Sequence, residues 1–279
     1  MDTELRNSIL LQKLSNYLNN YSDFITADMV GKISKDYDLD TNTSYQILLS
    51  QALDLDRELE HDLREIVKPL DINKYTNNPY YKNIKLDNVT HNDWQFQLMK
   101  YKPYEAFVYN DLVVKNGKVY PQVGYFDTEY FYPAILQNGR EWMLITPNEI
   151  ETMNEPINNA HGKVLTYGLG LGYFAYMASN KPNVNSVTIV EMDKSVIDLF
   201  NKYILPQFPH KEKIIIINAN AIEYAKDNSD NIDYVFADIW HDPSDAIDIY
   251  CQLKQCEKPN TQYDYWIEKT IKYYLGQTN

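Results

Sequence analysis

The stretch VLTYGLGLGYF, residues 164–174, places three of the chain's nine glycines within five positions. Gly168, Gly170 and Gly172 follow an apolar run and precede a segment with the composition of a helix. Glycines in a turn between a strand and a helix allow unusual dihedral angles and let another group approach the main chain closely. Because the N–H groups of the following helix point toward the same turn, we predict a ligand site there.

Outward from this turn, short apolar segments alternate with helical patterns. The predicted strands are 163–167, 186–191, 213–218, 232–238 and 262–267, and the predicted helices are 173–179, 194–205, 221–227, 245–256 and 268–275. Continuously apolar strands separated by helices indicate a parallel sheet that is covered on both faces. The expected fold class is therefore α/β, a doubly wound Rossmann-like sheet of about five strands with a short C-terminal part.

The first half of the chain has a different pattern. Apolar residues at helical spacing predict helices up to residue 70, with one continuous helix from Tyr45 to Ile66. A loop-rich linker is expected to follow. The dipeptides Asn116-Gly117 and Asn138-Gly139 then predict hairpin turns in a small antiparallel β-unit. We divide the chain into an N-terminal helical domain with its linker (1–103), the β-unit (104–145) and the Rossmann-like domain (146–279).

A helix is expected to begin at Thr146. Pro147 suits the first helical position, and Glu149 is placed to complete a capping box with Thr146.

Charge and composition exclude several classes of protein. The chain has 39 acidic and 26 basic residues, so a nucleic-acid partner is not expected. It contains no apolar run of about 18 residues, so no membrane span is expected. Its N-terminus lacks the features of a signal peptide. The two cysteines, Cys251 and Cys256, have neither zinc spacing nor a disulfide framework, so we expect no metal site and a cytoplasmic location.

The end of the second predicted strand supplies an acid. Glu191 lies 19 residues after Gly172, where a carboxylate can accept hydrogen bonds from both hydroxyls of a ribose. A dinucleotide fingerprint requires a small residue where this chain has Tyr173, and the turn contains no lysine or arginine for a pyrophosphate. The turn therefore favours a nucleoside ligand without phosphates over a dinucleotide, which disfavours a dehydrogenase.

Four segments together resemble a known family. VLTYGLGLG, VTIVEMD, INANAIEYAKD and YVFADIWHDP look like the first four motifs of class I S-adenosylmethionine-dependent methyltransferases. Within that superfamily, the chain is similar to the spermidine synthase-like branch. The resemblance implies S-adenosylmethionine as the cofactor, with the three glycines near its methionine and ribose, Glu191 at the ribose, Met192 on the adenine and Asn220 at the adenine amino group. The cofactor site that it implies is Tyr167, Gly168, Gly170, Gly172, Glu191, Met192, Asn220, Ala221 and Asp238.

The turn after the fourth predicted strand, ADIWHDPSD, is the candidate reacting site. Asp238, His241 and Asp242 are the candidate catalytic residues, because a carboxylate there can stabilise a sulfonium or accept a proton from an amine. Trp240 is expected either to cap the cofactor or to cover the sheet edge. Aminopropyl transferases similar to this chain have an Asp-x-x-Asp-Pro turn, whereas this turn is one residue longer.

Three hypotheses follow from these residues and from the resemblance. The first is an S-adenosylmethionine-dependent methyltransferase acting on a small neutral or cationic molecule. The second is a spermidine synthase-like aminopropyl transferase, which uses a decarboxylated donor. The third is a non-catalytic protein that binds the cofactor or serves as an interaction scaffold. The expected partner is a small-molecule substrate, and a homodimer is a possible assembly.

Overall fold

The computed structural model describes residues 2–86, 89–91, 94–227 and 231–276. The chain forms two compact units, one of residues 1–74 with 99–132 and the other of residues 75–98 with 133–277. Our division at residues 103 and 145 remains a prediction about domains, since a compact unit need not fold independently.

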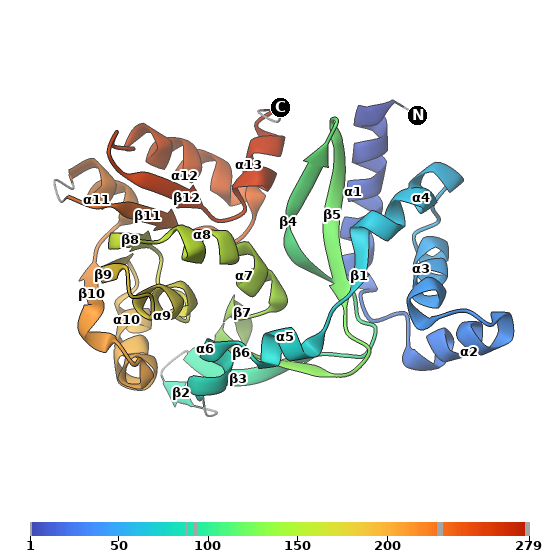
Figure 1. The fold of residues 1–279 in the computed structure, drawn as a ribbon, viewed down its shortest axis with the longest axis horizontal. Helices are drawn as coiled ribbons and strands as arrows, with labels where there is room; N and C mark the ends of the chain where they lie inside the picture. The colour runs from blue at the N-terminus through green and yellow to red at the C-terminus, as the bar shows by residue number, and fades with distance from the viewer. Residues whose placement is uncertain (1, 87–88, 92–93, 228–230, 277–279) are drawn as a thin grey trace. The chain divides into compact units, whose positions relative to one another are not determined.

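The second unit is built on a parallel sheet of five strands (Figure 1). Their order is β10-β9-β8-β11-β12. The strands are β8 (Gly162–Tyr167), β9 (Val184–Glu191), β10 (Ile214–Asn218), β11 (Tyr234–Ala237) and β12 (Gln262–Tyr265). The chain moves outward from β8 to β10 and then returns to pair β11 with β8. This reversal beside β8 is the topological switch point at which such sheets bind ligands.

Helices cover both faces of this sheet. The helices are α9 (Tyr173–Ser179), α10 (Lys194–Leu199), α11 (Ala221–Asp227), α12 (Pro243–Gln255) and α13 (Glu268–Tyr274). On one face, Phe174 of α9 packs on Phe236 of β11, with ring centroids 4.5 Å apart. On the other face, Val235 lines a small cavity with Ala225 of α11 and Cys256 at the end of α12. Since neighbouring strand residues point to opposite faces, the predicted doubly wound α/β fold is confirmed.

The predicted helix 194–205 is α-helical only in its first part. Asp193 begins α10 as expected, because its side chain accepts a hydrogen bond from the Ser195 N–H at 2.7 Å. A π-helical turn, η1 (Phe200–Ile204), and a 3₁₀ turn, η2 (Leu205–Gln207), then complete the segment, and a 3₁₀ turn η3 (Lys211–Lys213) precedes β10.

In the first unit, four helices pack with a three-stranded sheet of order β1-β5-β4. The elements are α1 (Thr3–Asn20), α2 (Ala27–Tyr37), α3 (Thr41–Ala52), α4 (Arg57–Ile66), β1 (Val67–Pro69), β4 (Phe107–Lys115) and β5 (Lys118–Tyr125). The predicted continuous helix from Tyr45 to Ile66 is wrong. Asp54 adopts a left-handed conformation with φ 48°, and Asp56 starts α4 by accepting a hydrogen bond from the Leu59 N–H.

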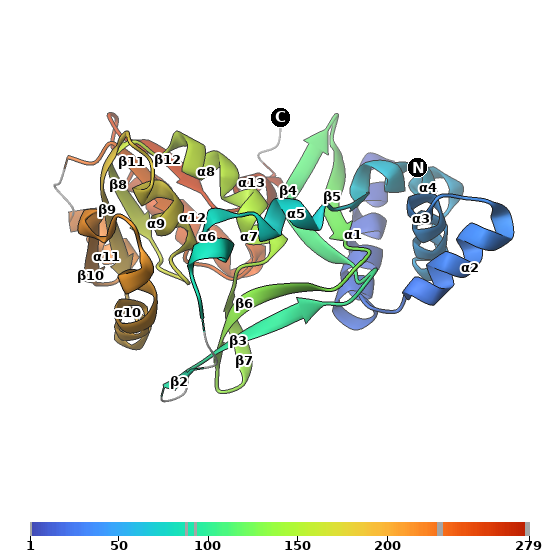
Figure 2. The ribbon, with the colours of Figure 1, turned by 60° about the horizontal axis from the view of Figure 1, so that its bottom comes forward.

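Both predicted hairpin turns are confirmed, but they belong to different sheets. Asn116-Gly117 joins β4 to β5, and Asn138-Gly139 joins β6 (Tyr130–Gln137) to β7 (Arg140–Leu144), with positive φ at all four residues. Strands β6 and β7 form a sheet with β2 (Thr90–His91) and β3 (Trp94–Tyr101), and Figure 2 shows these four strands together.

The predicted linker is more ordered than its loop-rich composition suggests. It contains β3 and two short helices, α5 (Ile72–Thr76) and α6 (Pro79–Asn83). Trp94 and Phe96 of β3 are buried while Gln95 is exposed, which is the alternation of a half-buried strand. The loop-rich composition therefore did not indicate the strand and the two short helices of this region.

Two short helices, α7 (Pro147–Thr152) and α8 (Asn154–Asn159), precede β8. Thr146 is the N-cap of α7 and Pro147 its first residue, as predicted, but the Thr146 side chain makes no capping hydrogen bond. The predicted capping box is therefore not formed, and Glu149 has a different environment. Cys251 and Cys256 are both free thiols. None of the described helices has the length and apolar character needed to cross a membrane.

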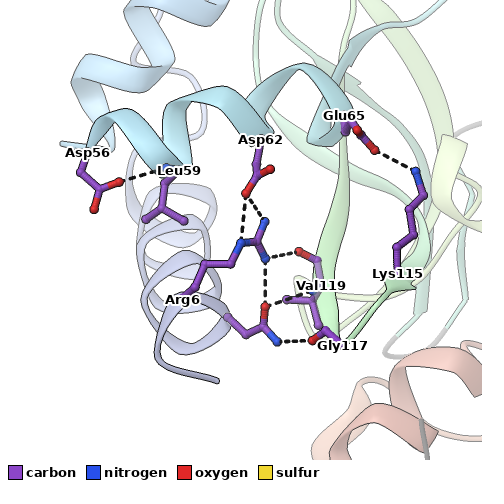
Figure 3. Close-up of polar contacts among 9 residues, drawn as sticks. Arg6, Asp56, Leu59, Asp62, Glu65, Lys115, Gly117 and Val119 are labelled. Carbon is purple, nitrogen blue, oxygen red and sulfur yellow. Dashed lines mark hydrogen bonds and ion pairs between the residues drawn. The ribbon is translucent and has the colours of Figure 1, made fainter. Parts of the chain in front are cut away.

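A buried arginine joins three elements of the first unit (Figure 3). Arg6 of α1 donates to the Asp62 carboxylate of α4, with Nε 3.0 Å from Oδ2. Its Nη1 also donates to the Val119 carbonyl of β5 at 2.8 Å. The side chain of Arg6 is 1% exposed, so this charge is almost fully removed from water. In contrast, the Lys115–Glu65 ion pair has side chains more than half exposed.

Replacing Arg6 by methionine should destabilise the chain by about 3–5 kcal/mol, because it leaves the partly buried Asp62 carboxylate without its partner. The matched change Lys115→Met removes an exposed, solvent-screened ion pair and should cost far less. Urea unfolding of both variants measures the difference. Similar losses in the two variants would contradict the structural role given to Arg6.

Candidate active site

The predicted site residues lie at the carboxyl ends of adjacent parallel strands. The glycine turn follows β8, Glu191 ends β9, Asn220 comes shortly after β10, and Asp238 follows β11 directly. Because parallel strands end at the same edge of their sheet, the fold brings these residues to one edge, next to the reversal of strand order.

The main chains of the glycine turn and of Asp238 are in direct contact. The Asp238 N–H donates to the Tyr167 carbonyl at 2.9 Å. Gly168 has φ +96°, and a Cβ on it would lie 2.0 Å from the Asp238 carbonyl oxygen. A side chain at this position would therefore push Asp238 away from the sheet.

The other two glycines differ from each other. A Cβ on Gly172 would lie 2.4 Å from the Phe200 ring, so this glycine also makes room for the chain itself. A Cβ on Gly170 would meet only the Met143 sulfur, at 3.8 Å, which is an ordinary contact. Gly170 is thus the one of these three glycines at which a Cβ would fit without displacing a neighbour.

Glu191 ties the turn to the end of β9. Its Oε2 accepts a hydrogen bond from the Leu169 N–H at 3.2 Å, and its Oε1 accepts one from the Asp193 N–H at 2.8 Å. The residue is only partly buried, and each carboxylate oxygen has a further lone pair for a donor such as a ribose hydroxyl. The neighbouring Met192 is 71% exposed and offers an apolar surface.

Three of the predicted cofactor residues have roles in the fold. The Asn220 Oδ1 accepts hydrogen bonds from the Ile222 and Glu223 N–H groups, at 2.9 and 3.2 Å, and so starts α11. Ala221 and the Tyr167 side chain are buried, and Tyr167 lies on the face covered by α11 and α12. Their contact with a cofactor remains a prediction.

A second carboxyl group, that of Glu149 in α7, interacts with Asp238 of the reacting turn. The sequence pattern had indicated Glu149 as part of a helix cap. Burial raises the pKa of Asp238 to about 7, while the charge of His241 acts in the opposite direction. Burial, and then the charge of Asp238, raise the pKa of Glu149 well above its usual range. Both residues keep some solvent exposure, yet the protein around them removes enough water for desolvation to dominate.

The other residues of the reacting turn, His241, Asp242 and Trp240, contact α12, Trp142 and the edge strand β12. Nδ1 of the exposed His241 lies 3.1 Å from Asp245, and its ring contacts Trp142 edge-on. The Asp242 carboxylate accepts a hydrogen bond from the Ser244 N–H at 2.6 Å and is the N-cap of α12. Trp240 is buried and stacks on Tyr265 of the edge strand β12, in agreement with the expectation that it covers the sheet edge. The catalytic roles of His241 and Asp242 remain predictions.

Sequence reasoning missed the support that the segment before β2 gives to the glycine turn. The Tyr80 hydroxyl of α6 donates to the Leu171 carbonyl at 2.6 Å, and the Asn78 amide donates to the Tyr173 hydroxyl at 2.8 Å. The Asn-Pro dipeptide before α6 indicated only a turn. The buried Tyr173, which argued against a dinucleotide fingerprint, is held by this contact.

The chemistry of these residues is compatible with an adenosyl group. A Cβ on Gly170 would displace no neighbour, the Glu191 carboxylate has further acceptor positions, and Met192 is exposed next to it. Among the described residues, no group of three or more His, Cys, Asp or Glu side chains could hold a metal ion.

Comparison with known families supports the resemblance drawn from the motifs. Residues 154–259 match the family model described as the spermine/spermidine synthase domain. The match covers less than half of the chain and includes the glycine turn, Glu191, Asn220 and Asp238. It confirms the predicted resemblance to the spermidine synthase-like branch of the class I methyltransferase superfamily.

Solved structures with detectable similarity are distant. The spermidine synthase from Thermotoga maritima is 17% identical, with a TM-score of 0.35 and coverage of 49% of this chain and 52% of that chain. A spermidine synthase in complex with the transition state analogue AdoDATO gives the same values. The methyltransferase domain of bacterial CtHen1-C is 17% identical, with a TM-score of 0.23 and coverage of 26% and 39%. The chain spans about half the length of the spermidine synthases it matches. No curated protein matches it.

The glycine turn gives a test of what each glycine does. Gly170→Ala should cost about 1–2 kcal/mol for its left-handed conformation, because its Cβ would make only an ordinary contact with Met143. Gly168→Ala should cost about 1–3 kcal/mol more, because its Cβ would overlap the Asp238 carbonyl. Urea unfolding measures both. If Gly170→Ala is the more damaging change, the close contact between Gly168 and Asp238 is not what constrains the turn.

Proposed function

We propose that this protein is a transferase that moves an alkyl group from an adenosyl sulfonium donor to an amine. Aminopropyl transfer, implied by the resemblance to spermidine synthases, is the first candidate. The observation that carries the proposal is Asp238, a carboxyl group with a pKa of about 7 at the carboxyl end of β11, in main-chain contact with the glycine turn.

The nucleoside would lie against the glycine turn. Gly170 leaves room for its sulfur side, the Glu191 carboxylate would accept hydrogen bonds from the ribose hydroxyls, and Met192 would cover one side of the base. When bound, the donor supplies an electrophilic carbon attached to a positively charged sulfur, which leaves as a neutral thioether with the electron pair of the broken carbon–sulfur bond.

Asp238 would prepare the nucleophile. An alkylamine carries a proton in neutral water, because its pKa lies near 10, as that of lysine does. A carboxylate with a pKa near 7 can hold this ammonium group and accept its proton. The nitrogen lone pair then forms the new carbon–nitrogen bond, and the excess proton leaves to water. The rest of the rate gain comes from alignment of nitrogen, carbon and sulfur.

One observation favours methyl transfer to a small acceptor as the second candidate. The second acid of the reacting turn, Asp242, is engaged as the N-cap of α12, and the turn is one residue longer than Asp-x-x-Asp-Pro. The turn therefore offers a single uncommitted carboxylate to an acceptor, which suits a molecule with one positive charge.

The two nucleoside products separate these candidates. The chain is incubated with decarboxylated S-adenosylmethionine or with S-adenosylmethionine, together with 1,4-diaminobutane and a panel of monoamines. Mass spectrometry should detect 5′-methylthioadenosine for aminopropyl transfer and S-adenosylhomocysteine for methyl transfer. Donor binding without either product would support the non-catalytic alternative.

The variant Asp238→Asn should lower turnover by about 10²–10⁴-fold while donor affinity is retained, because it removes a proton acceptor and keeps the shape of the side chain. Asp248→Asn, an exposed position on α12, is the matched control and should keep wild-type turnover. Full turnover by Asp238→Asn would remove Asp238 from the mechanism.

A further inference from the structure

Helix α7 carries a carboxyl group that its own N-terminus does not use. Glu149 occupies the position from which an acid usually closes a capping box, but Thr146 makes no side-chain cap. Among the residues that the structure describes, none donates a hydrogen bond to the Glu149 side chain, and its environment is set by burial and by the charge of Asp238. The group is thus available for a role outside the helix.

Trp266 fixes this helix to the end of β11. Its main-chain N–H donates to the carbonyl of Ala237, the residue before Asp238, at 2.9 Å. Its indole Nε1 donates to Thr152 Oγ1 of α7, also at 2.9 Å. The Tyr75 hydroxyl further anchors α7 through Glu151 at 2.9 Å. Residues two and three positions after Glu149 are therefore tethered, which holds its side chain in a set place relative to Asp238.

The charges around the two carboxyl groups come from four elements. Glu149 belongs to α7 and Asp238 follows β11, with His241 in the same turn. The charge of Glu149 also contributes, as a minor cause, to the raised pKa of Tyr173 in α9. His241 is already paired with Asp245 of α12, and Asp242 is committed to its cap. The second carboxyl group of the reacting site is therefore supplied by α7.

We propose that Glu149 is a positioning residue for the reaction: held by the Trp266 tether beside Asp238, it forms with Asp238 a pair of carboxyl groups that carries a single negative charge, to which an ammonium group binds. The proposal rests on the proposed function. Two ionised carboxylates so close together would repel each other, whereas one protonated and one ionised group leave a single charge to match one amine. Loss of this shared proton as the pH rises would then restore the repulsion.

The raised pKa values of Glu149 and Asp238 make the stability of the folded chain depend on pH. In the folded chain both carboxyl groups hold protons at pH values where the same groups in the unfolded chain have lost them. The folded state therefore binds more protons than the unfolded state from about pH 4 to pH 7, and its stability falls as the pH rises through this range.

Thermal unfolding without ligand from pH 5 to pH 9 tests the pair directly. Glu149→Gln should be more stable than the wild type by an amount that grows with pH, to about 2–4 °C at pH 9. In the Asp238→Asn background this gain should be smaller, because the repulsion from Asp238 is gone while the burial of residue 149 remains. The control Glu155→Gln, an exposed acid of α8, should give no pH-dependent gain. An equal gain in both backgrounds, or none, would overturn the proposal.

If Glu149→Gln does not fold, carboxyl ¹³C NMR of the wild-type chain gives the same answer. Two coupled titrations above the usual range of carboxyl groups would support the pair. Titration of every carboxyl group near pH 4 would overturn it.

Activity supplies a second readout once turnover is observed. Glu149→Gln should retain turnover at neutral pH and extend the alkaline limit by about one pH unit, because an amide mimics the protonated acid. Glu149→Ala should lower kcat at neutral pH. Unchanged pH profiles would contradict the inference alone. Absence of turnover in the wild type would contradict the proposed function alone, since the ligand-free unfolding data stand without it.

Discussion

The main-chain contact between Gly168 and Asp238 is the constraint on which the site depends. It joins the turn after the first strand of the parallel sheet to the end of the fourth strand, at the point where the strand order reverses. A side chain on residue 168 would occupy the place of the Asp238 carbonyl. The absence of that side chain lets the two strand ends meet and sets a carboxyl group beside the glycine turn.

The glycine cluster therefore serves two purposes. Gly168 and Gly172 make room for other parts of the protein, namely the Asp238 main chain and the Phe200 ring. At Gly170, by contrast, a Cβ would make only an ordinary contact with the Met143 sulfur. The tight packing around the first two holds the turn in place, and this rigidity is what a transfer reaction needs when it depends on aligning two reacting atoms. Burial also raises the pKa of Asp238, at the end of the fourth strand, to about 7.

The sheet and the strand ends could be predicted from the sequence because β8, β9 and β11 are short apolar runs bounded by polar turns. Glu191 and Asp238 could be predicted as site residues because they lie at the carboxyl ends of parallel strands, where such sheets bind ligands. Glu149 was assigned to a helix cap, since Thr-Pro-x-Glu matches that local pattern, and its partner lies far along the chain. The break before α4 was missed because Leu55 and Leu59 continue the apolar spacing while Asp56 starts a new helix. Local patterns identify elements, whereas contacts between distant segments decide which side chain acts on which.

We propose that the glycine turn and Glu191 form a site for an adenosyl thioether. Calorimetric titration of the wild-type chain with decarboxylated S-adenosylmethionine, S-adenosylhomocysteine and NAD tests this proposal. Saturable binding of an adenosyl sulfonium or thioether is expected, weakened at least about tenfold in Glu191→Ala by the loss of a charged hydrogen-bond acceptor, and no binding of NAD. Binding of NAD alone, or equal affinity in Glu191→Ala, would contradict it.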